Sequence, residues 1–208
     1  MKTEEKRKAG KDVKNPNHPK KGSRIAVDPI RPLEDIKDIK SILSDKPRDL
    51  LLFSLRINNG LRMGDLLQLK VKKVRHLKEN ESTDILEEKT GKYNILMVNK
   101  YVYKALRNYL DKVDLDDEEF LFTSRKRKNH LLVPSVNCLI KKWAKSINLK
   151  GNYGAHSLRK TFGYIHRTVH GTSWEHLADR FNHSTPAVTR HYLGITKDEV
   201  KNILLKEI

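Results

Sequence analysis

The apolar residues of this 208-residue chain recur mostly at helical spacing once the first thirty positions are passed. From Pro32 they repeat every three or four positions, which predicts an amphipathic helix with one buried face. A second segment opens at Pro47 and is apolar almost all round, which predicts a helix at the centre of the core. Asn-Asn-Gly at 58–60 ends it, so Arg62 is expected at the start of the next, short helix.

The spacing shortens beyond residue 69, where the chain turns from helical repeats to short alternating runs. Segments 71–74, 84–88 and 93–98 read as strands, and a Thr-Gly pair separates the last two. We therefore predict a small antiparallel sheet. Lys89 would lie at the tip of its hairpin.

The second half of the chain returns to helical spacing. An amphipathic helix is predicted over 99–113 and another over 134–147, with an acidic connector at 114–119 and a basic loop at 124–128 between them. Residues 196–208 are predicted to form a last amphipathic helix, which either folds back on its own domain or docks on a neighbouring protomer. We expect the second arrangement in the functional assembly.

The charge of the chain favours a polyanionic partner. It carries 43 Lys and Arg against 26 Asp and Glu, a net charge of +17. Residues 1–29 read as a basic flexible arm, either a solubilising tail or a segment that follows phosphates. Residues 1–24 account for +6, so the remainder is basic in its own right, and 30–195 is long enough for one catalytic domain.

Other functional classes are disfavoured by composition. The single cysteine, Cys138, excludes an internal disulfide and a multi-cysteine zinc site, and fits a reducing cytoplasm. No apolar run reaches the length of a membrane span, and the N-terminus lacks the apolar segment of a signal peptide. We expect a cytoplasmic protein that binds no membrane, no cofactor and no small-molecule ligand.

The stretch from 153 to 194 carries the candidate chemistry. His156 and Arg159 stand three apart in a helical segment, so their side chains share one face and could hold one anion. His183 precedes Ser-Thr-Pro, which supplies a cap and a proline for a short helix. That helix carries Tyr192 on its last turn, and Gly194 ends it.

These motifs resemble the tyrosine recombinases, the phage-integrase family. The matching elements are His-x-x-Arg, a Gly-His-Ser-Ser-like turn, a tyrosine nine residues beyond its His, and an upstream Asn-Gly-Leu-Arg62-Met-Gly-Asp65 box. Lys89, before Thr-Gly, matches the family's hairpin lysine, and Lys92 is the alternative. The resemblance covers roughly residues 32 to 195. It implies an α+β, mainly α-helical fold, the catalytic core that recombinases share with type IB topoisomerases, with a small antiparallel β-sheet.

The resemblance also implies a role for each matching residue. Arg62 and Arg159 would clamp the nonbridging oxygens of a DNA phosphate, because guanidinium groups stay charged and donate as a planar fork. Tyr192 would be the nucleophile that forms a 3′-phosphotyrosine bond. His156 would handle the tyrosine proton, and His183 would donate a hydrogen bond to the phosphate.

Two more residues complete the implied site. Lys89 would protonate the leaving 5′ oxygen, and Asp65 would orient Arg62. The candidate DNA contacts are basic residues of the loop and of two helices, namely Arg125, Lys126, Arg127, Lys128, Lys141, Lys142, Lys145 and Lys160.

The remaining histidines have a simpler interpretation. The set His166, His170, His176 and His191 is assigned to packing or to the surface. A metal site built from His156, His183 and His191 is disfavoured, because their spacing matches no standard ligand set and the neighbouring arginine would repel a cation.

Three functions remain open from the sequence. The first is a site-specific DNA recombinase, or integrase, acting on double-stranded DNA as a homotetramer on synapsed sites and as a monomer when free. The second is a type IB topoisomerase-like DNA-relaxing enzyme, and the third a catalytically silent DNA-binding module. The family's N-terminal clamp domain has no room here, so the chain is either an excised catalytic domain or a minimal member.

Overall fold

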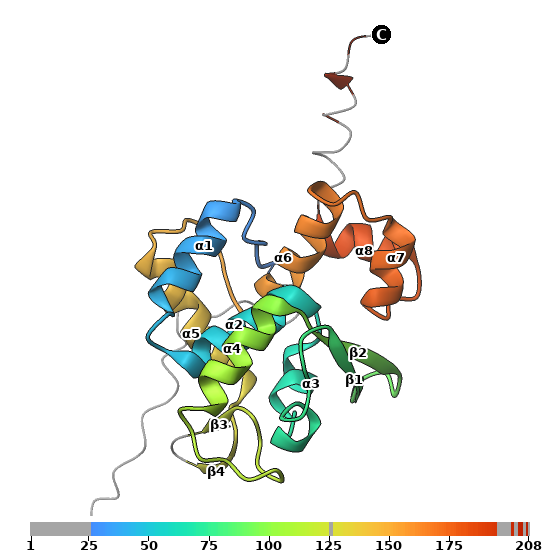
Figure 1. Ribbon diagram of the computed structural model, residues 1–208. Helices are drawn as coiled ribbons and strands as arrows, with labels where there is room; N and C mark the ends of the chain where they lie inside the picture. The colour runs from blue at the N-terminus through green and yellow to red at the C-terminus, as the bar shows by residue number, and fades with distance from the viewer. Residues whose placement is uncertain (1–25, 125–126, 195–200, 202–203, 206, 208) are drawn as a thin grey trace, which may run out of the picture.

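The computed structural model describes residues 26–124, 127–194, 201, 204–205 and 207. Helices dominate, and two small hairpins lie at the periphery (Figure 1). The elements, in chain order, are α1 (Leu33–Ile42), α2 (Pro47–Asn59), α3 (Met63–Leu67), the 3-10 helix η1 (Val71–Lys73), β1 (Glu81–Leu86), β2 (Tyr93–Val98), α4 (Lys100–Leu110), β3 (Thr123–Ser124), β4 (Arg127–His130), α5 (Val133–Ser146), α6 (Ala155–Thr168), α7 (Trp174–Arg180) and α8 (Pro186–Leu193).

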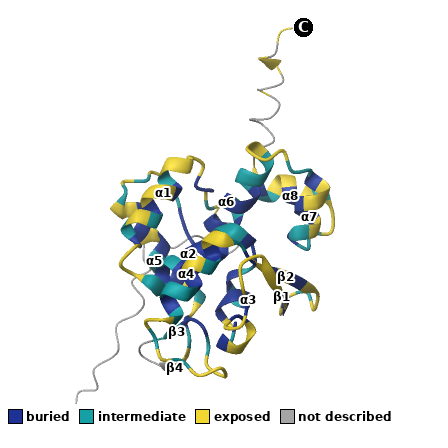
Figure 2. Ribbon diagram, in the orientation of Figure 1, coloured by how far each residue is buried: buried dark blue, intermediate teal, exposed yellow. Residues whose placement is uncertain are grey.

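Helix α2 runs through the centre of the fold, as its sequence predicts. Its residues 51–56 are all buried (Figure 2). Gly60 ends the helix at φ 59°, a left-handed conformation that favours glycine. A Cβ at Gly60 would lie 2.5 Å from Cδ1 of Phe162, so the glycine also lets α6 pack closely. Arg62 follows as the N-cap of α3, as expected.

The predicted sheet is confirmed in part. β1 pairs antiparallel with β2, with Leu86 opposite Tyr93 at the hairpin end. The expectation that 71–74 forms a strand is wrong, because Val71–Lys73 is a 3-10 helix. Its backbone bonds the connector instead: the amide of Val71 donates to Glu119 O at 3.0 Å. A short apolar run cannot by itself reveal which segment its backbone will bond.

The other sequence-predicted elements have mixed outcomes. Helices α4 and α5 confirm the predicted 99–113 and 134–147 helices, with shorter bounds. Of the loop predicted at 124–128, Ser124 ends β3 and Arg127 begins β4, while 125–126 lie outside the described residues. Helix α7 was not predicted. Most of the predicted helix at 196–208 and most of the 1–29 arm lie outside the described residues.

Two groups of buried apolar side chains hold the described part of the fold together. The larger spans α1 to α5, the β1–β2 hairpin and the first turn of α6. The smaller consists of Phe162, Trp174, Leu177, Phe181 and Leu193, from α6, α7, α8 and the turn after α7. Figure 1 shows α7 and α8 on the far side of α6 from α1 and α5. Helix α6 therefore connects the main core to a smaller helical unit.

Candidate active site

The candidate catalytic side chains come from five segments that meet beside α6. The turn before α3 carries Arg62, and the loop of the β1–β2 hairpin carries Lys89. The first turns of α6 supply His156 and Arg159. The turn after α7 carries His183, and the last turn of α8 carries Tyr192.

Arg159 connects the main core to the α7–α8 unit. Its side chain is buried and donates from Nη1 to Gly60 O at 2.8 Å and from Nη2 to Phe181 O at 2.7 Å. Arg62 reaches the same carbonyl, with Nη2 3.5 Å from Phe181 O. Burial, opposed by the nearby Tyr192 phenol, lowers the pKa of Arg159 to about 10. The guanidinium groups of Arg62 and Arg159 therefore meet at the carbonyl oxygen of Phe181.

A carboxylate that the sequence interpretation missed lies behind Arg62. Glu87 is completely buried and forms an ion pair with Arg62 Nη1. Its carboxylate also accepts from Thr90 Oγ1 at 2.9 Å, Asn94 Nδ2 at 3.0 Å and Asn182 Nδ2 at 2.8 Å. Burial acts to raise the pKa of Glu87, but these hydrogen bonds outweigh it, and the pKa is lowered.

Asp65, the expected orienting group, has a different contact. Its Oδ1 accepts from the backbone amide of Glu88 at 3.1 Å, and its buried Oδ2 has no hydrogen-bond partner among the described residues. Burial raises the pKa of Asp65, and the charge of Glu87 adds to the effect. The carboxylate that contacts Arg62 is that of Glu87.

Two signals in the sequence point to this network. Glu87 stands two residues before Lys89, at the end of a predicted strand, where a fully buried acid needs partners. Asn182 occupies the glycine position of the family's Gly-His turn and has φ 49°. Its left-handed conformation directs an amide side chain toward Glu87.

His183 and Tyr192 pack against each other on the small helical unit. Their ring centroids are 5.4 Å apart, and His183 Nδ1 lies 2.9 Å from Thr189 Oγ1. Burial, followed by the charges of Arg159 and Arg62, lowers the pKa of His183 to about 4. The Tyr192 hydroxyl is buried without a hydrogen-bond partner among the described residues. Burial raises its pKa, and Arg159 offsets part of the shift.

The other predicted side chains lie around this centre. His156 is exposed, but the protein packed around its ring, followed by the charges of Arg56 and Arg159, lowers its pKa. The charge of Lys89 acts on the same ring. Lys89 itself is exposed in the hairpin loop. Lys160 Nζ lies 5.4 Å from the centre of the Tyr192 ring, so this predicted DNA contact is beside the candidate nucleophile.

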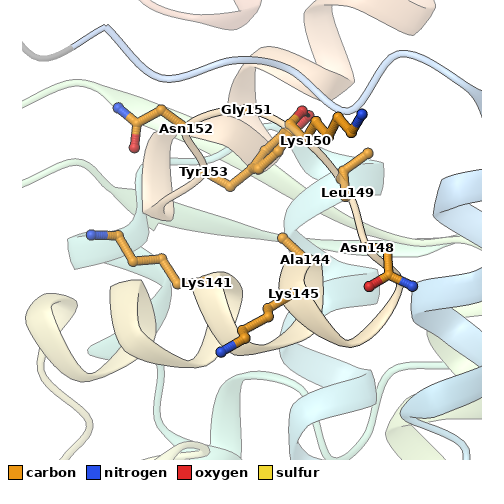
Figure 3. A pocket seen from close by; sticks show the side chains of 9 residues that line it. All are labelled: Lys141, Ala144, Lys145, Asn148, Leu149, Lys150, Gly151, Asn152 and Tyr153. Carbon is orange, nitrogen blue, oxygen red and sulfur yellow. Dashed lines mark hydrogen bonds between the residues drawn. The ribbon is translucent and has the colours of Figure 1, made fainter.

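The remaining predicted DNA contacts fall in two regions. Lys141, Lys142 and Lys145 are exposed on α5. Two of them, Lys141 and Lys145, line a hollow of about 470 Å³ with Asn148 and Lys150 of the following loop (Figure 3). Of the predicted basic loop, Arg125 and Lys126 lie outside the described residues, and Arg127 and Lys128 begin β4.

In the described ranges, no group of three or more His, Cys, Asp or Glu side chains is arranged to hold a metal ion. Among the helices of those same ranges, none combines the length and the apolar character needed to cross a bilayer.

Two solved structures that share this fold are those of a recombinase and an integrase. The crystal structure of XerA recombinase superposes with a TM-score of 0.70 at 23% identity, covering 85% of this chain and 64% of that one. A lambda integrase dimer bound to a COC′ core site gives 0.61 at 16% identity, covering 82% and 49%. Both likenesses concern the fold, the α+β, mainly helical core predicted from the sequence.

Sequence comparison identifies the family. The phage integrase family model matches residues 32–199, and the chain belongs to that family. The probable integrase/recombinase YoeC of Bacillus subtilis is 32% identical over 84% of this chain and 93% of its own length. Tyrosine recombinase XerC of Caldanaerobacter subterraneus is 29% identical over 77% of this chain, but that match covers only 45% of XerC.

These comparisons decide between the readings that the sequence left open. The prediction of a tyrosine recombinase catalytic domain, an enzyme that breaks and rejoins DNA strands, is confirmed. They favour the integrase reading and give no support to a topoisomerase-like enzyme or a silent DNA-binding module.

Proposed function

We propose that this chain cleaves and rejoins double-stranded DNA at a specific site through a covalent 3′-phosphotyrosine intermediate, with Tyr192 as the nucleophile. The observation that carries the proposal is the approach of Arg62 and Arg159 to one carbonyl, Phe181 O, next to the His183–Tyr192 pair. Two guanidiniums beside a phenol form a site for an anion that the phenol can attack. No metal is needed in this scheme.

The reaction would proceed by in-line displacement at phosphorus. Tyr192 Oη attacks the phosphorus, its proton passes to neutral His156, and the bond from phosphorus to the 5′ oxygen breaks. Lys89 supplies the proton that this oxygen takes up. Arg62 and Arg159 hold the two nonbridging oxygens as their negative charge grows, and each such donor contributes roughly 3–4 kcal/mol to transition-state stabilisation.

The hydrogen bonds within the site support these roles. With a pKa of about 4, His183 is neutral at pH 7, and a Thr189 hydroxyl that donates to its Nδ1 would leave the proton on Nε2, free for a phosphate oxygen. Glu87 would fix Arg62 in place. The buried Tyr192 hydroxyl must become accessible for attack, so a small shift of α8 would accompany DNA binding.

The DNA would lie against the basic surface around the site. The exposed lysines of α5, the basic hairpin of β3 and β4, and Lys160 are the proposed phosphate contacts, and Lys89 would enter the minor groove. Binding by such contacts weakens steeply with salt. A homotetramer on two synapsed sites, formed from free monomers with exchanged C-terminal helices, completes the proposal.

A nicked duplex that loses its short 5′ fragment after cleavage tests the reaction. Because the target sequence is unknown, covalent complexes would be selected from a library of nicked duplexes with a randomised centre. We expect protein attached to the 3′ end, and none with Tyr192→Phe, while Tyr164→Phe reacts normally. Selection that yields no Tyr192-dependent adduct would refute the proposal.

Strand transfer and assembly are measured with the selected site. Transfer of the cleaved strand to a second duplex supports recombination, whereas relaxation of supercoils without transfer supports the topoisomerase-like alternative. Sedimentation with the site is expected to give a tetramer. A form lacking residues 196–208 should still bind DNA but fail to assemble.

A further inference from the structure

Arg56 is a fully buried arginine of α2, outside the family motifs. Its hydrogen bonding is poor: Nη2 donates to Ala155 O at 3.4 Å, and the buried Nε and Nη1 have no partner among the described residues. An uncompensated buried guanidinium is costly, and native proteins seldom retain one without a function. Arg159, equally enclosed, has two strong hydrogen bonds.

The position of Arg56 explains what such a charge could do. Its one hydrogen bond reaches the first residue of α6, directly before His156. The groups whose charges act on it are Arg159, Tyr192, Asp65 and Arg62, all from the candidate site. Three guanidiniums and one unpartnered phenol thus share a region of low dielectric constant. The carboxylates of Asp65 and Glu87 offset part of the repulsion among the guanidiniums, and an anion formed at the phenol would offset more of it.

We propose that Arg56 is a positioning residue of the strand-cleavage reaction, whose buried charge acts through Tyr192 by stabilising the phenolate that attacks the DNA. This inference rests on the proposed function of Tyr192. No covalent step involves Arg56, and it does not contact the phosphate. Leaving its N–H donors unpaired lowers the stability of the fold, but it keeps a positive charge where the phenolate develops.

The effect of Arg56 on neighbouring groups supports this role. Its charge is among those that lower the pKa of Tyr192 against the effect of burial. It is also the largest charge effect that lowers the pKa of His156, which must be neutral to accept the phenol proton. Both influences favour attack at neutral pH.

Replacing the guanidinium by an apolar chain of similar length tests the proposal. Arg56→Met should raise the melting temperature, because it removes an uncompensated buried charge. It should also slow single-turnover cleavage at pH 7 by roughly 10- to 100-fold, with the rate recovering as pH rises. Arg56→Lys, which keeps the charge, should restore most of the rate and the wild-type pH profile.

A second arginine serves as the matched control. Arg107 of α4 donates to Arg75 O and Leu77 O, which are outside the candidate site, so Arg107→Met should lower the melting temperature and leave the cleavage rate unchanged. Loss of thermal stability in Arg56→Met, with normal cleavage per folded molecule, would assign Arg56 a structural role and overturn the proposal. So would an unshifted pH profile.

A measurement without DNA separates this inference from the proposed function. The ultraviolet titration of tyrosinate, taken as the difference between each protein and its Tyr192→Phe form, reports ionisation of that one phenol. We expect Arg56→Met to move it to higher pH, and Arg56→Lys to leave it near wild type. An unchanged titration refutes the role of Arg56, whereas absence of a covalent adduct in the wild type refutes only the proposed reaction.

Discussion

The main core and the α7–α8 unit support opposite sides of the candidate site. The main core contains 33 buried hydrophobic residues, and it holds the segments that carry Arg62 and Arg159. The smaller cluster contains five, and it supports His183 and Tyr192. Because local stability follows buried apolar contact, the phosphate-binding side should be rigid and the nucleophile side easier to move. A buried tyrosine hydroxyl requires such movement before attack.

Several polar connections tie the small unit to the rest, and Arg180 of α7 supplies one by donating from Nε to Asn59 O at 2.9 Å. Arg159 bonds Gly60 on one side and Phe181 on the other. Glu87 joins the hairpin to Arg62 and to Asn182, the residue before His183. Directional bonds can fix the relative position of two parts that share little apolar contact. We therefore expect that breaking these links lowers the rate of DNA cleavage more than it lowers the stability of the main core.

The largest effect is expected from Arg159→Gln. It removes a phosphate donor and a connection between the two units, so cleavage of the nicked duplex should fall by roughly 10³-fold or more. Hydrogen exchange should rise in α7 and α8 but not in α2. Arg159→Lys keeps the charge without the planar fork and should recover little activity. Uniform exchange across all helices would contradict the division into two units.

The second-largest effect is expected from Glu87, the buried carboxylate that pairs with Arg62. Glu87→Gln keeps the shape of the side chain but removes the counter-charge of Arg62, so cleavage should fall roughly 100-fold and stability by about 1–3 kcal/mol. Glu88→Gln, an exposed neighbour, is the control and should behave like wild type. Asp65→Asn tests the competing assignment: a larger loss of cleavage there than in Glu87→Gln would return the orienting role to Asp65.

A pH effect on stability is expected from His183. Its pKa of about 4 lies below the ordinary value of 6.5, so between these pH values the unfolded chain takes up a proton that the folded protein refuses. Stability should therefore fall as pH drops from 6.5 to 4, by about 2–3 kcal/mol from this group. His183→Gln should flatten that part of the denaturation profile. His191→Gln, exposed on the following helix α8, should leave it unchanged.

The smallest effect is expected from Gly163→Ala, at the contact between α6 and α8. A Cβ at Gly163 would lie 2.9 Å from both Leu193 Cδ2 and Phe181 Cζ. Gly163→Ala should displace α8, costing about 1–2 kcal/mol after the gain in helix propensity, and slow cleavage roughly tenfold. Gly64→Ala, which meets nothing within 4 Å, is the control. Normal cleavage with a lowered melting temperature would show that the position of α8 is not critical.

Elements whose signals are local can be predicted from the sequence. Helix α2 follows from its apolar pattern, and the limits of α8 follow from Thr185, Pro186 and Gly194, because caps and glycine conformations act within one turn. The motif residues from Arg62 to Tyr192 are identified by their resemblance to the tyrosine recombinases, and the fold brings them to one region. Helix α7 was missed, although Ser173 caps it.

The partners and the burial of those residues depend on tertiary contacts. The partner of Arg62 is Glu87, 25 residues away, and the strand expected at 71–74 became a 3-10 helix because its backbone bonds the acidic connector. The burial of Arg56 likewise depends on how α6 packs across α2. Hydrogen bonds and desolvation at such points depend on distances between segments remote in the chain, which no local pattern encodes.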